Sequence, residues 1–298
     1  MRIHDAHCHF FSRRFFEALA SQMKQPPADP GWELPQSLGW EAPGEPEQLA
    51  GRWISELDKH HVSRAALIAS VPGDEASVAA AVARHPHRFV GFFMLDPTKD
   101  DAVVRVRHAL GELKLRAVCL FPAMQRYSVQ DPRAMKVFEE AASHPGGAVF
   151  VHCGVLSVGV RAKLGLPSPF DIRFGNPLDL HTVATAFPKL PIIIPHFGAG
   201  MFREALMVAD LSPNILLDSS SSNTWIKYTS GLTLRRVFRQ ALEVVGPGRL
   251  LFGTDSSFFP RGWQMAIFQA QRKVLQELSV DGDKIFHGNF ERVFGAVV

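Results

Sequence analysis

The 298-residue sequence contains only three cysteines and no long apolar run. Cys8, Cys119 and Cys153 are widely separated and form no C-x-x-C pair, which excludes a disulfide framework and a structural zinc knuckle and indicates reduced thiols. No apolar stretch approaches the roughly 20 residues that span a bilayer, and the opening segment MRIHDAHCHFF lacks the apolar region and cleavage site of a signal peptide. We therefore expect a cytoplasmic protein without a membrane partner.

An excess of charge of one sign is also absent, because 32 Lys and Arg residues are balanced by 29 Asp and Glu residues. The formal net charge of +3 is spread along the chain, without the basic runs or basic–aromatic segments that bind a phosphate backbone. Nucleic acid is therefore not an expected partner. A hydrophobic content of 46% with 20% charged residues is ordinary for a globular protein and argues against disorder.

Short apolar runs alternate with helical patterns along the chain, which indicates parallel βαβ units. Near-continuous apolar runs suit a sheet that is buried on both faces. Eight such strands favour a closed (β/α)8 TIM barrel of the α/β class, and a chain of this length fits one such domain over residues 1–298. The predicted strands are Arg2–Ala6, Ala65–Val71, Phe89–Met94, Leu115–Phe121, Ala148–His152, Ile192–His196, Ile215–Asp218 and Leu250–Gly253.

One region interrupts the alternation of strands and helices. Residues 25–47 are dense in Pro, Gly and Trp, and they separate the first strand from a helix around Arg52–His60. An insertion after a barrel strand usually lies over the catalytic face, where it forms a lid or a substrate wall. A surface loop or a subunit contact is an equal alternative. The other predicted helices are Glu75–Arg84, Ala102–Leu113, Arg133–Ser143, Leu180–Phe187, Leu234–Val245 and Trp263–Leu278.

Histidine and aspartate occur where predicted strands end. His7 and His9 are two residues apart, so both side chains face one side of an extended strand. His152, His196 and Asp255 each follow an apolar run, in AVFVHCG, IIIPHFGAG and LLFGTDSS. Barrel enzymes take their catalytic groups from the carboxyl ends of several strands, so these residues are predicted to meet at one site. A single such histidine is more often a core or rim residue, but four strand ends together are not explained in this way.

The expected ligands are imidazole nitrogens and a carboxylate oxygen. This donor set suits one divalent metal, with zinc favoured and manganese, iron, cobalt or nickel as alternatives. Alternation turns Cys8 and Cys153 to the opposite face, where they are expected to pack and not to bind metal. Asp5 shares the parity of His7, so it is expected either to orient a ligand or to lie in the lower layer of the barrel.

The motifs HDAHCHFF, FVHCG, IIIPHFGAG and GTDSSFFPRG, in this order, resemble the amidohydrolase-related (amidohydrolase 2) family of metal-dependent TIM-barrel hydrolases and decarboxylases. The resemblance also includes RFVGFFMLDP and PNILLDSSSS, so it covers nearly the whole chain. That family includes aminocarboxymuconate semialdehyde decarboxylase. The resemblance further suggests a homodimer.

The resemblance implies a role for each residue of the site. His7, His9, His152 and Asp255 become the metal ligands, and His196 becomes the acid/base group beside the metal. In other members of the wider superfamily the residue equivalent to His196 is itself a ligand, so both roles stay open. Asp255 is also expected to accept the proton of an attacking water, and His196 has the intrinsic pKa of a proton shuttle.

Two departures from the family pattern affect the predicted reaction. Binuclear members carry a carbamylated lysine at the end of the fourth strand, where this chain has Cys119 in RAVCLFPA, so one metal is expected. Decarboxylases tend to have a Tyr-Pro-Phe-Pro-like run after the aspartate, whereas residues 256–261 read SSFFPR. We therefore expect a hydrolase of a lactone, amide or ester of a small organic substrate. The alternatives are a decarboxylase of an aromatic or muconate-like acid and a metal-binding barrel without catalysis.

Four residues are candidates for substrate binding. Arg52, at the start of the helix after the insertion, and Arg261, just beyond Asp255, are suited to clamp a substrate carboxylate with two hydrogen bonds. A surface position is the alternative for each arginine. Phe11 and Trp225 are expected to line an apolar pocket, with ordinary core packing as the alternative. Specificity in barrel enzymes depends on such loop residues, so the sequence does not name the substrate.

Overall fold

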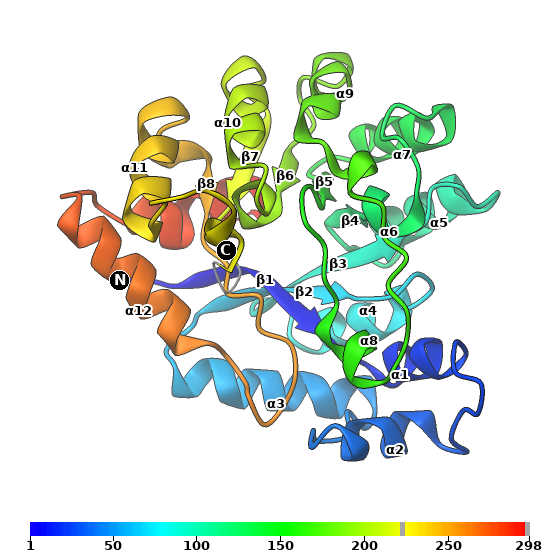
Figure 1. Cartoon of the computed structure of the whole chain (residues 1–298). Helices are drawn as coiled ribbons and strands as arrows, with labels where there is room; N and C mark the ends of the chain where they lie inside the picture. Colours follow the sequence, from blue (N-terminus) through cyan, green and yellow to red (C-terminus); the bar gives the residue numbers. More distant parts are fainter. Residues whose placement is uncertain (221–223, 296–298) are drawn as a thin grey trace.

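Eight parallel strands follow one another around a single sheet in the order of the sequence (Figure 1). The structure is a computed structural model that describes residues 1–220 and 224–295. The barrel closes because the backbone N–H of Ala6 donates to the Phe252 carbonyl at 2.8 Å and that of His9 donates to the Ser256 carbonyl at 2.7 Å. This confirms the predicted (β/α)8 barrel. The strands are β1 His4–Phe10, β2 Arg64–Ala69, β3 Phe89–Leu95, β4 Ala117–Leu120, β5 Ala148–Val151, β6 Ile192–Ile194, β7 Ile215–Asp218 and β8 Leu250–Leu251.

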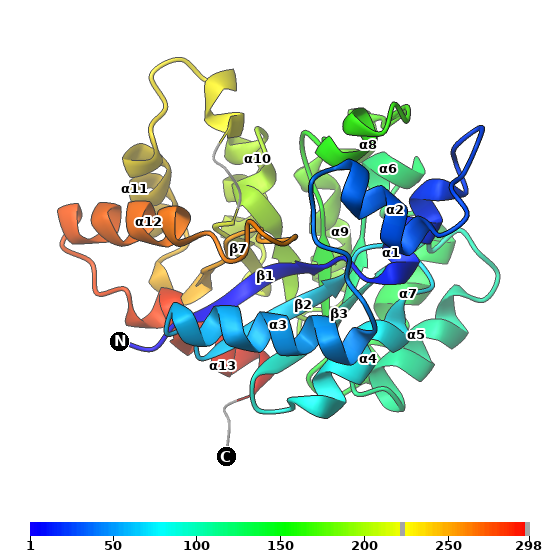
Figure 2. The same cartoon turned by 90° about the horizontal axis from the view of Figure 1, so that it is seen from below.

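Helices surround the strands on the outside of the barrel (Figures 1 and 2). Several begin at residues that satisfy free backbone N–H groups, such as Thr233, whose hydroxyl accepts from the Arg236 N–H at 3.3 Å. The main helices are α3 Pro46–Lys59, α4 Glu75–Arg84, α5 Ala102–Gly111, α7 Pro132–Ser143, α9 Leu180–Ala186, α10 Phe202–Leu211, α11 Leu234–Val244, α12 Met265–Glu277 and α13 Asn289–Phe294. The remaining helices are α1 Arg13–Ala20, α2 Pro30–Ser37, α6 Pro122–Gln125 and α8 Gly159–Lys163.

Single helical turns complete the connections between these elements. They are η1 Ile172–Gly175, η2 Pro177–Asp179, η3 Pro195–Gly198, η4 Thr224–Tyr228, η5 Pro247–Arg249 and the π-helical turn η6 Lys284–Gly288. In residues 1–220 and 224–295, no helix has the length and hydropathy needed to cross a membrane.

Strand side chains alternate between the barrel interior and the layer under the helices. The interior holds Ile68, Phe92 and Phe150, which pack with one another and with inward residues of the other strands. The outer layer holds strand residues such as Val149 and helix residues such as Trp53 in one apolar cluster. The alternation along each strand therefore tells which residues beyond the strand end point toward the barrel axis.

Strand β1 departs from simple alternation. Its pairing with β2 shifts between Asp5 and Cys8, which is a β-bulge. Ala6 packs in the interior while Cys8 and Phe10 pack in the outer layer. The expectation that Asp5 shares the face of His7 therefore needs correction, because the bulge adds one residue between them.

Asp5 instead connects the outer face of β1 to the chain after β8. Its carboxylate accepts hydrogen bonds from the His7 N–H at 2.9 Å, the Thr254 hydroxyl at 2.5 Å and the Trp263 indole at 2.7 Å. The first partner belongs to His7 itself, and Thr254 directly precedes Asp255 in the sequence. Asp5 thus holds the backbone segments that carry two site residues, and among the described residues no imidazole ring forms a hydrogen bond with it.

The insertion packs over one side of the barrel mouth. Its helix α2 contacts α1, and Trp40 lies in a separate apolar cluster with Phe15, Val160 and Leu166. Val160 belongs to α8 in the long connection after β5, and Figure 1 draws α8 beside α1. The insertion and this connection therefore form one apolar cover.

Asp74, just before α4, is a buried carboxylate with one unsatisfied oxygen. Its Oδ2 accepts from the Ser12 hydroxyl at 2.6 Å, whereas Oδ1 has no hydrogen-bond partner among the described residues. Burial, only partly offset by the hydrogen bond from Ser12, raises the pKa of Asp74 to about 6 from 3.8. The folded state therefore binds a proton more tightly than the unfolded state does, and stability falls as pH rises between these two values.

We expect Asp74→Asn to raise the free energy of unfolding by about 1–3 kcal/mol near pH 8 and to have little effect near pH 4. The amide keeps an acceptor for Ser12 and carries no charge to desolvate. Urea denaturation at both pH values measures the difference. An equal increase at both would contradict the assignment of the pH dependence to Asp74.

Candidate metal centre and its cavity

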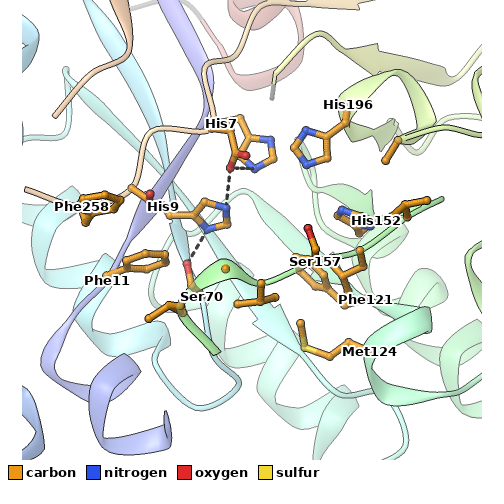
Figure 3. Close-up of a pocket in the computed structure, with 18 of the residues that line it drawn as sticks. His7, His9, Phe11, Ser70, Phe121, Met124, His152, Ser157, His196 and Phe258 are labelled. Atoms are coloured by element: carbon orange, nitrogen blue, oxygen red, sulfur yellow. Dashed lines mark hydrogen bonds and ion pairs between the residues drawn. The ribbon is translucent and has the colours of Figure 1, made fainter. Parts of the chain in front are cut away.

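The five polar residues predicted from strand ends line one cavity of about 650 Å³. His7 and His9 come from β1, His152 follows β5, His196 lies in η3 after β6, and Asp255 follows β8. Figure 3 shows the four imidazoles around a common space. The carboxyl ends of four strands supply the five residues, which is the position that catalytic groups take in barrel enzymes.

Three of these residues form a compact group. One ligand atom each from His7, His9 and Asp255 lie within 4.8 Å of one another. The Oδ1 atom of Asp255 is 3.1 Å from His9 Nε2 and 3.6 Å from His7 Nε2. His152 lies farther across the cavity, on the other side of His196. The ring centroid of His196 is 4.9 Å from that of His7 and 5.2 Å from that of His152.

The rings of His7 and His9 are oriented by partners on neighbouring strands. His7 Nδ1 is 2.7 Å from Oδ2 of Asp218, and this carboxylate oxygen accepts a hydrogen bond from the Nδ1–H group. The Ser70 hydroxyl donates to the Ile68 carbonyl at 3.0 Å, so its oxygen accepts from His9 Nδ1 at 2.8 Å. Both Nε2 lone pairs are then available on the side of Asp255, as in histidines that bind metals.

Sequence reasoning missed Ser70 and Asp218 as site residues, although a signal was present. Both lie within predicted strands, and both continue the inward alternation that begins with Ile68 on β2 and Leu216 on β7. A polar residue at the inward position nearest the carboxyl end of a barrel strand faces the site. Counting parity along each strand would have found them.

We expect Ser70→Ala to weaken the binding of a divalent metal by about 10- to 100-fold, because His9 Nδ1 then loses the oxygen that orients its ring. Competition with a chelator measures the affinity. Ser157→Ala is the matched control, since Ser157 lines the same cavity and has no hydrogen bond to an imidazole among the described residues. Equal affinities for the two variants would refute a role for Ser70 in positioning His9.

His196 is held by the segment that follows β7. Its Nδ1 is 3.2 Å from the Ser220 carbonyl oxygen, which can only accept, so the Nδ1 atom carries the proton and Nε2 is free. The Ser220 hydroxyl lies 3.0 Å from the same atom and 2.8 Å from His7 Nδ1. Ser220 therefore contacts both rings, and sequence reasoning missed this connection.

The loops that carry these residues have unusual backbone geometry. His196 has φ of +56° and Asp255 has φ of +59°, a left-handed region that is uncommon for residues other than glycine. A Cβ atom at Gly154 would lie 2.1 Å from the Gly198 carbonyl oxygen, so the loops after β5 and β6 approach closely only because Gly154 has none. This contact brings His152 toward His196.

Burial keeps most of the imidazoles neutral. Burial lowers the pKa of His9, of His152 and of His196 below the ordinary value of 6.5. His152 Nδ1 is also buried without a hydrogen-bond partner in the described part of the chain. Neutral rings with an unused nitrogen are what a metal requires of histidine.

His7 and Asp255 respond to charged neighbours. Burial opposes protonation of His7, but the carboxylate of Asp218 reverses this and raises its pKa. Burial opposes ionisation of Asp255, yet the neighbouring imidazoles of His9 and His7 hold its pKa below the usual range. The site thus combines nitrogen donors with an ionised oxygen donor, which fits a divalent metal.

Three of the four predicted substrate-binding residues lie at the cavity, and one does not. Phe11, Trp225 and Arg261 line the cavity. Arg52 does not, because its guanidinium donates to the Ala42 carbonyl at 2.8 Å and also bonds the Pro43 carbonyl and Glu41. We correct the prediction for Arg52: it holds the insertion and is not free to clamp a substrate.

The three cysteines are free and buried, as expected. Cys8 and Cys153 pack in the outer layer, and Cys119 packs inside the barrel on β4. Burial raises the pKa of Cys119, so its thiol stays protonated. A neutral side chain thus occupies this inner position of β4.

The family model described as amidohydrolase matches residues 4–296. The structure resembles 5-carboxyvanillate decarboxylase LigW from Sphingomonas paucimobilis, with a TM-score of 0.67 and 17% identity over 99% of both chains. It also resembles an amidohydrolase from Burkholderia multivorans with bound zinc, with a TM-score of 0.62 and 13% identity over 100% of both chains.

A curated relative matches only locally. Protein fluG of Emericella nidulans is 29% identical over 106 residues, which are 36% of this chain and 12% of fluG. The chain therefore spans a small part of that relative. The amidohydrolase match, in contrast, extends over nearly the whole sequence, and we conclude that this chain belongs to the amidohydrolase family of enzymes.

Proposed function

We propose that the chain binds one divalent metal, preferably zinc, and hydrolyses a lactone, amide or ester of a small organic substrate. The proposed ligands are His7, His9, His152 and Asp255. The observation that supports this most is the meeting of His7, His9 and Asp255 within 4.8 Å in a cavity that His196 also lines. A divalent metal supplies Lewis acidity, which polarises a carbonyl group and makes a water more acidic.

His196 is the proposed acid/base group. With Nδ1 bonded to the Ser220 carbonyl, the Nε2 atom is the one that takes and returns a proton. The same carbonyl stabilises the ring when it becomes positively charged. Asp255, held ionised by His9 and His7, is the proposed acceptor for the first proton of the attacking water.

The rest of the cavity is suited to binding a small substrate. Its volume lies within the range of about 300–1,000 Å³ that is typical of small-molecule sites. Phe11 and Trp225 supply apolar contact area. Arg261 donates through Nη2 to the Ser257 hydroxyl at 2.6 Å, and its other N–H groups are available for a substrate carboxylate near Asp255.

Decarboxylation of an aromatic or muconate-like acid is the second candidate, and Arg261 is the observation that favours it. A decarboxylase must hold a carboxylate near the metal and then deliver a proton to carbon. Arg261 lines the cavity beside Asp255, and His196 is positioned to donate the proton. Hydrolysis remains our leading proposal because the run after Asp255 differs from that of the decarboxylases.

A two-arm screen distinguishes the reactions. Lactones, esters and amides are followed by acid release, and aromatic and muconate-like acids by carbon dioxide release, with Asp255→Ala as the blank. We expect acid release that depends on Asp255. Carbon dioxide release that depends on Asp255, without hydrolysis of any compound, would reverse our ordering of the two reactions.

A further inference from the structure

Basic residues predominate over acidic ones around the cavity. Lys163, Lys227 and Arg261 line it, and Asp255 is the one carboxylate among the described lining residues. Asp255 already interacts with His9. A cavity with uncompensated positive charge attracts anions, and a divalent metal would increase that charge.

Lys163 is placed at this cavity by the packing of its helix. Val160, on the same helix α8, lies in the apolar cluster with Trp40. Arg161 points elsewhere, because it donates to Gln22 Oε1 at 2.8 Å and to the Pro167 carbonyl at 3.0 Å. With α8 attached in this way, the Lys163 ammonium lies 5.7 Å from the centre of the Trp40 ring. Lys163 has no ion pair within residues 1–220 and 224–295.

Trp40, the aromatic partner of this lysine, belongs to a group of stacked rings. Trp40 stacks on Phe258 at a centroid distance of 3.9 Å and an angle of 10°, and Phe11 stacks on Phe15 at 4.0 Å and 2°. Phe11 and Trp40 are also nearly parallel, at 15°. These rings all line the cavity, so its mouth offers parallel aromatic faces beside a cation.

We propose that Trp40 and Lys163 form a second subsite, which binds a planar, negatively charged part of the substrate away from the metal centre. The proposal rests on the proposed function in that it takes this cavity as the substrate site. Trp40 comes from the insertion and Lys163 from the connection after β5, so the subsite exists only where these two segments meet. The substrate class that follows is a planar organic acid whose anionic group is distinct from the reacting carbonyl.

Calorimetry with two probes tests the subsite in the full, metal-loaded chain. The probes are naphthalenesulfonate and the neutral methyl naphthyl sulfone, which share a flat ring and differ in charge. We expect the sulfonate to bind about tenfold more tightly at low salt, and this preference to shrink as salt screens the charges. Because calorimetry measures binding, failure of the proposed hydrolysis would not alter the result.

Variants assign the preference to its residues. Lys163→Met should lower the preference for the sulfonate about five- to tenfold, the loss expected for one charged contact, while Lys163→Arg should keep it. Lys189→Met removes an exposed lysine that does not line the cavity and should change the preference less than about twofold. Trp40→Leu should weaken both probes by a similar factor. Equal binding of the probes, no binding of either, or an unchanged preference in Lys163→Met would overturn the proposal.

Discussion

Asp255→Ala is expected to leave the purified protein almost without metal, whereas the wild-type chain should hold close to one divalent metal. The substitution removes the only carboxylate among the proposed ligands, whose Oδ1 lies 3.1 Å from His9 Nε2. Removing a residue that orients a ligand lowers metal affinity by roughly 10- to 100-fold, and removing a ligand itself should lower the affinity further. Elemental analysis measures the content and identifies the metal. The double substitution of His7 and His9 by alanine should have the same result.

The control for this experiment is Asp100→Ala, which removes an exposed carboxylate that does not line the cavity. Its metal content should equal that of the wild type. Full occupancy in Asp255→Ala or in the double variant would show that the metal is held elsewhere. The proposed centre would then be abandoned, together with the function that depends on it.

His196→Ala is expected to keep the metal and to lower turnover by about two to four orders of magnitude, the range for losing a general acid or base. The reason is that Nε2 is the proposed proton carrier, while His7, His9, His152 and Asp255 suffice as ligands. Elemental analysis and kcat are measured on the same preparation, with a substrate from the screen. Exposed His87 provides the control, since His87→Ala should change neither quantity.

The outcome also decides between the two roles that the sequence left open for His196. Loss of metal together with loss of turnover would identify His196 as a ligand. Turnover unchanged from the wild type would remove it from the mechanism. In the second case Asp255 would be the remaining proton carrier among the described cavity residues.

The general plan of the site was predictable from local patterns. Apolar runs define strands, and the residue types that follow them reveal the site, because parallel strands in a barrel end at the same face. His152 and Asp255 were found in this way, and they line one cavity with His7, His9 and His196. Predicting those five residues required no information beyond strand position and side-chain chemistry.

Other features depend on contacts between segments far apart in the chain. The bulge in β1 separates Asp5 from His7, and no local pattern indicates it. His196 lies in the turn η3 and not in a strand, because β6 ends at Ile194. Arg52 looked free in the sequence, but it bonds backbone carbonyls of the insertion.

Local patterns were enough to predict the barrel, the family and the identity of the candidate ligands, since alternation and strand-end chemistry are local properties of the chain. The orientation of those residues and their surroundings depend on contacts that form only when the chain folds. Ser220 contacts the rings of both His7 and His196, and Lys163 lies beside Trp40. Ser220 and His7, like Lys163 and Trp40, are more than 100 residues apart in the sequence. Such pairs leave no mark in composition or spacing, because packing between separate loops creates them.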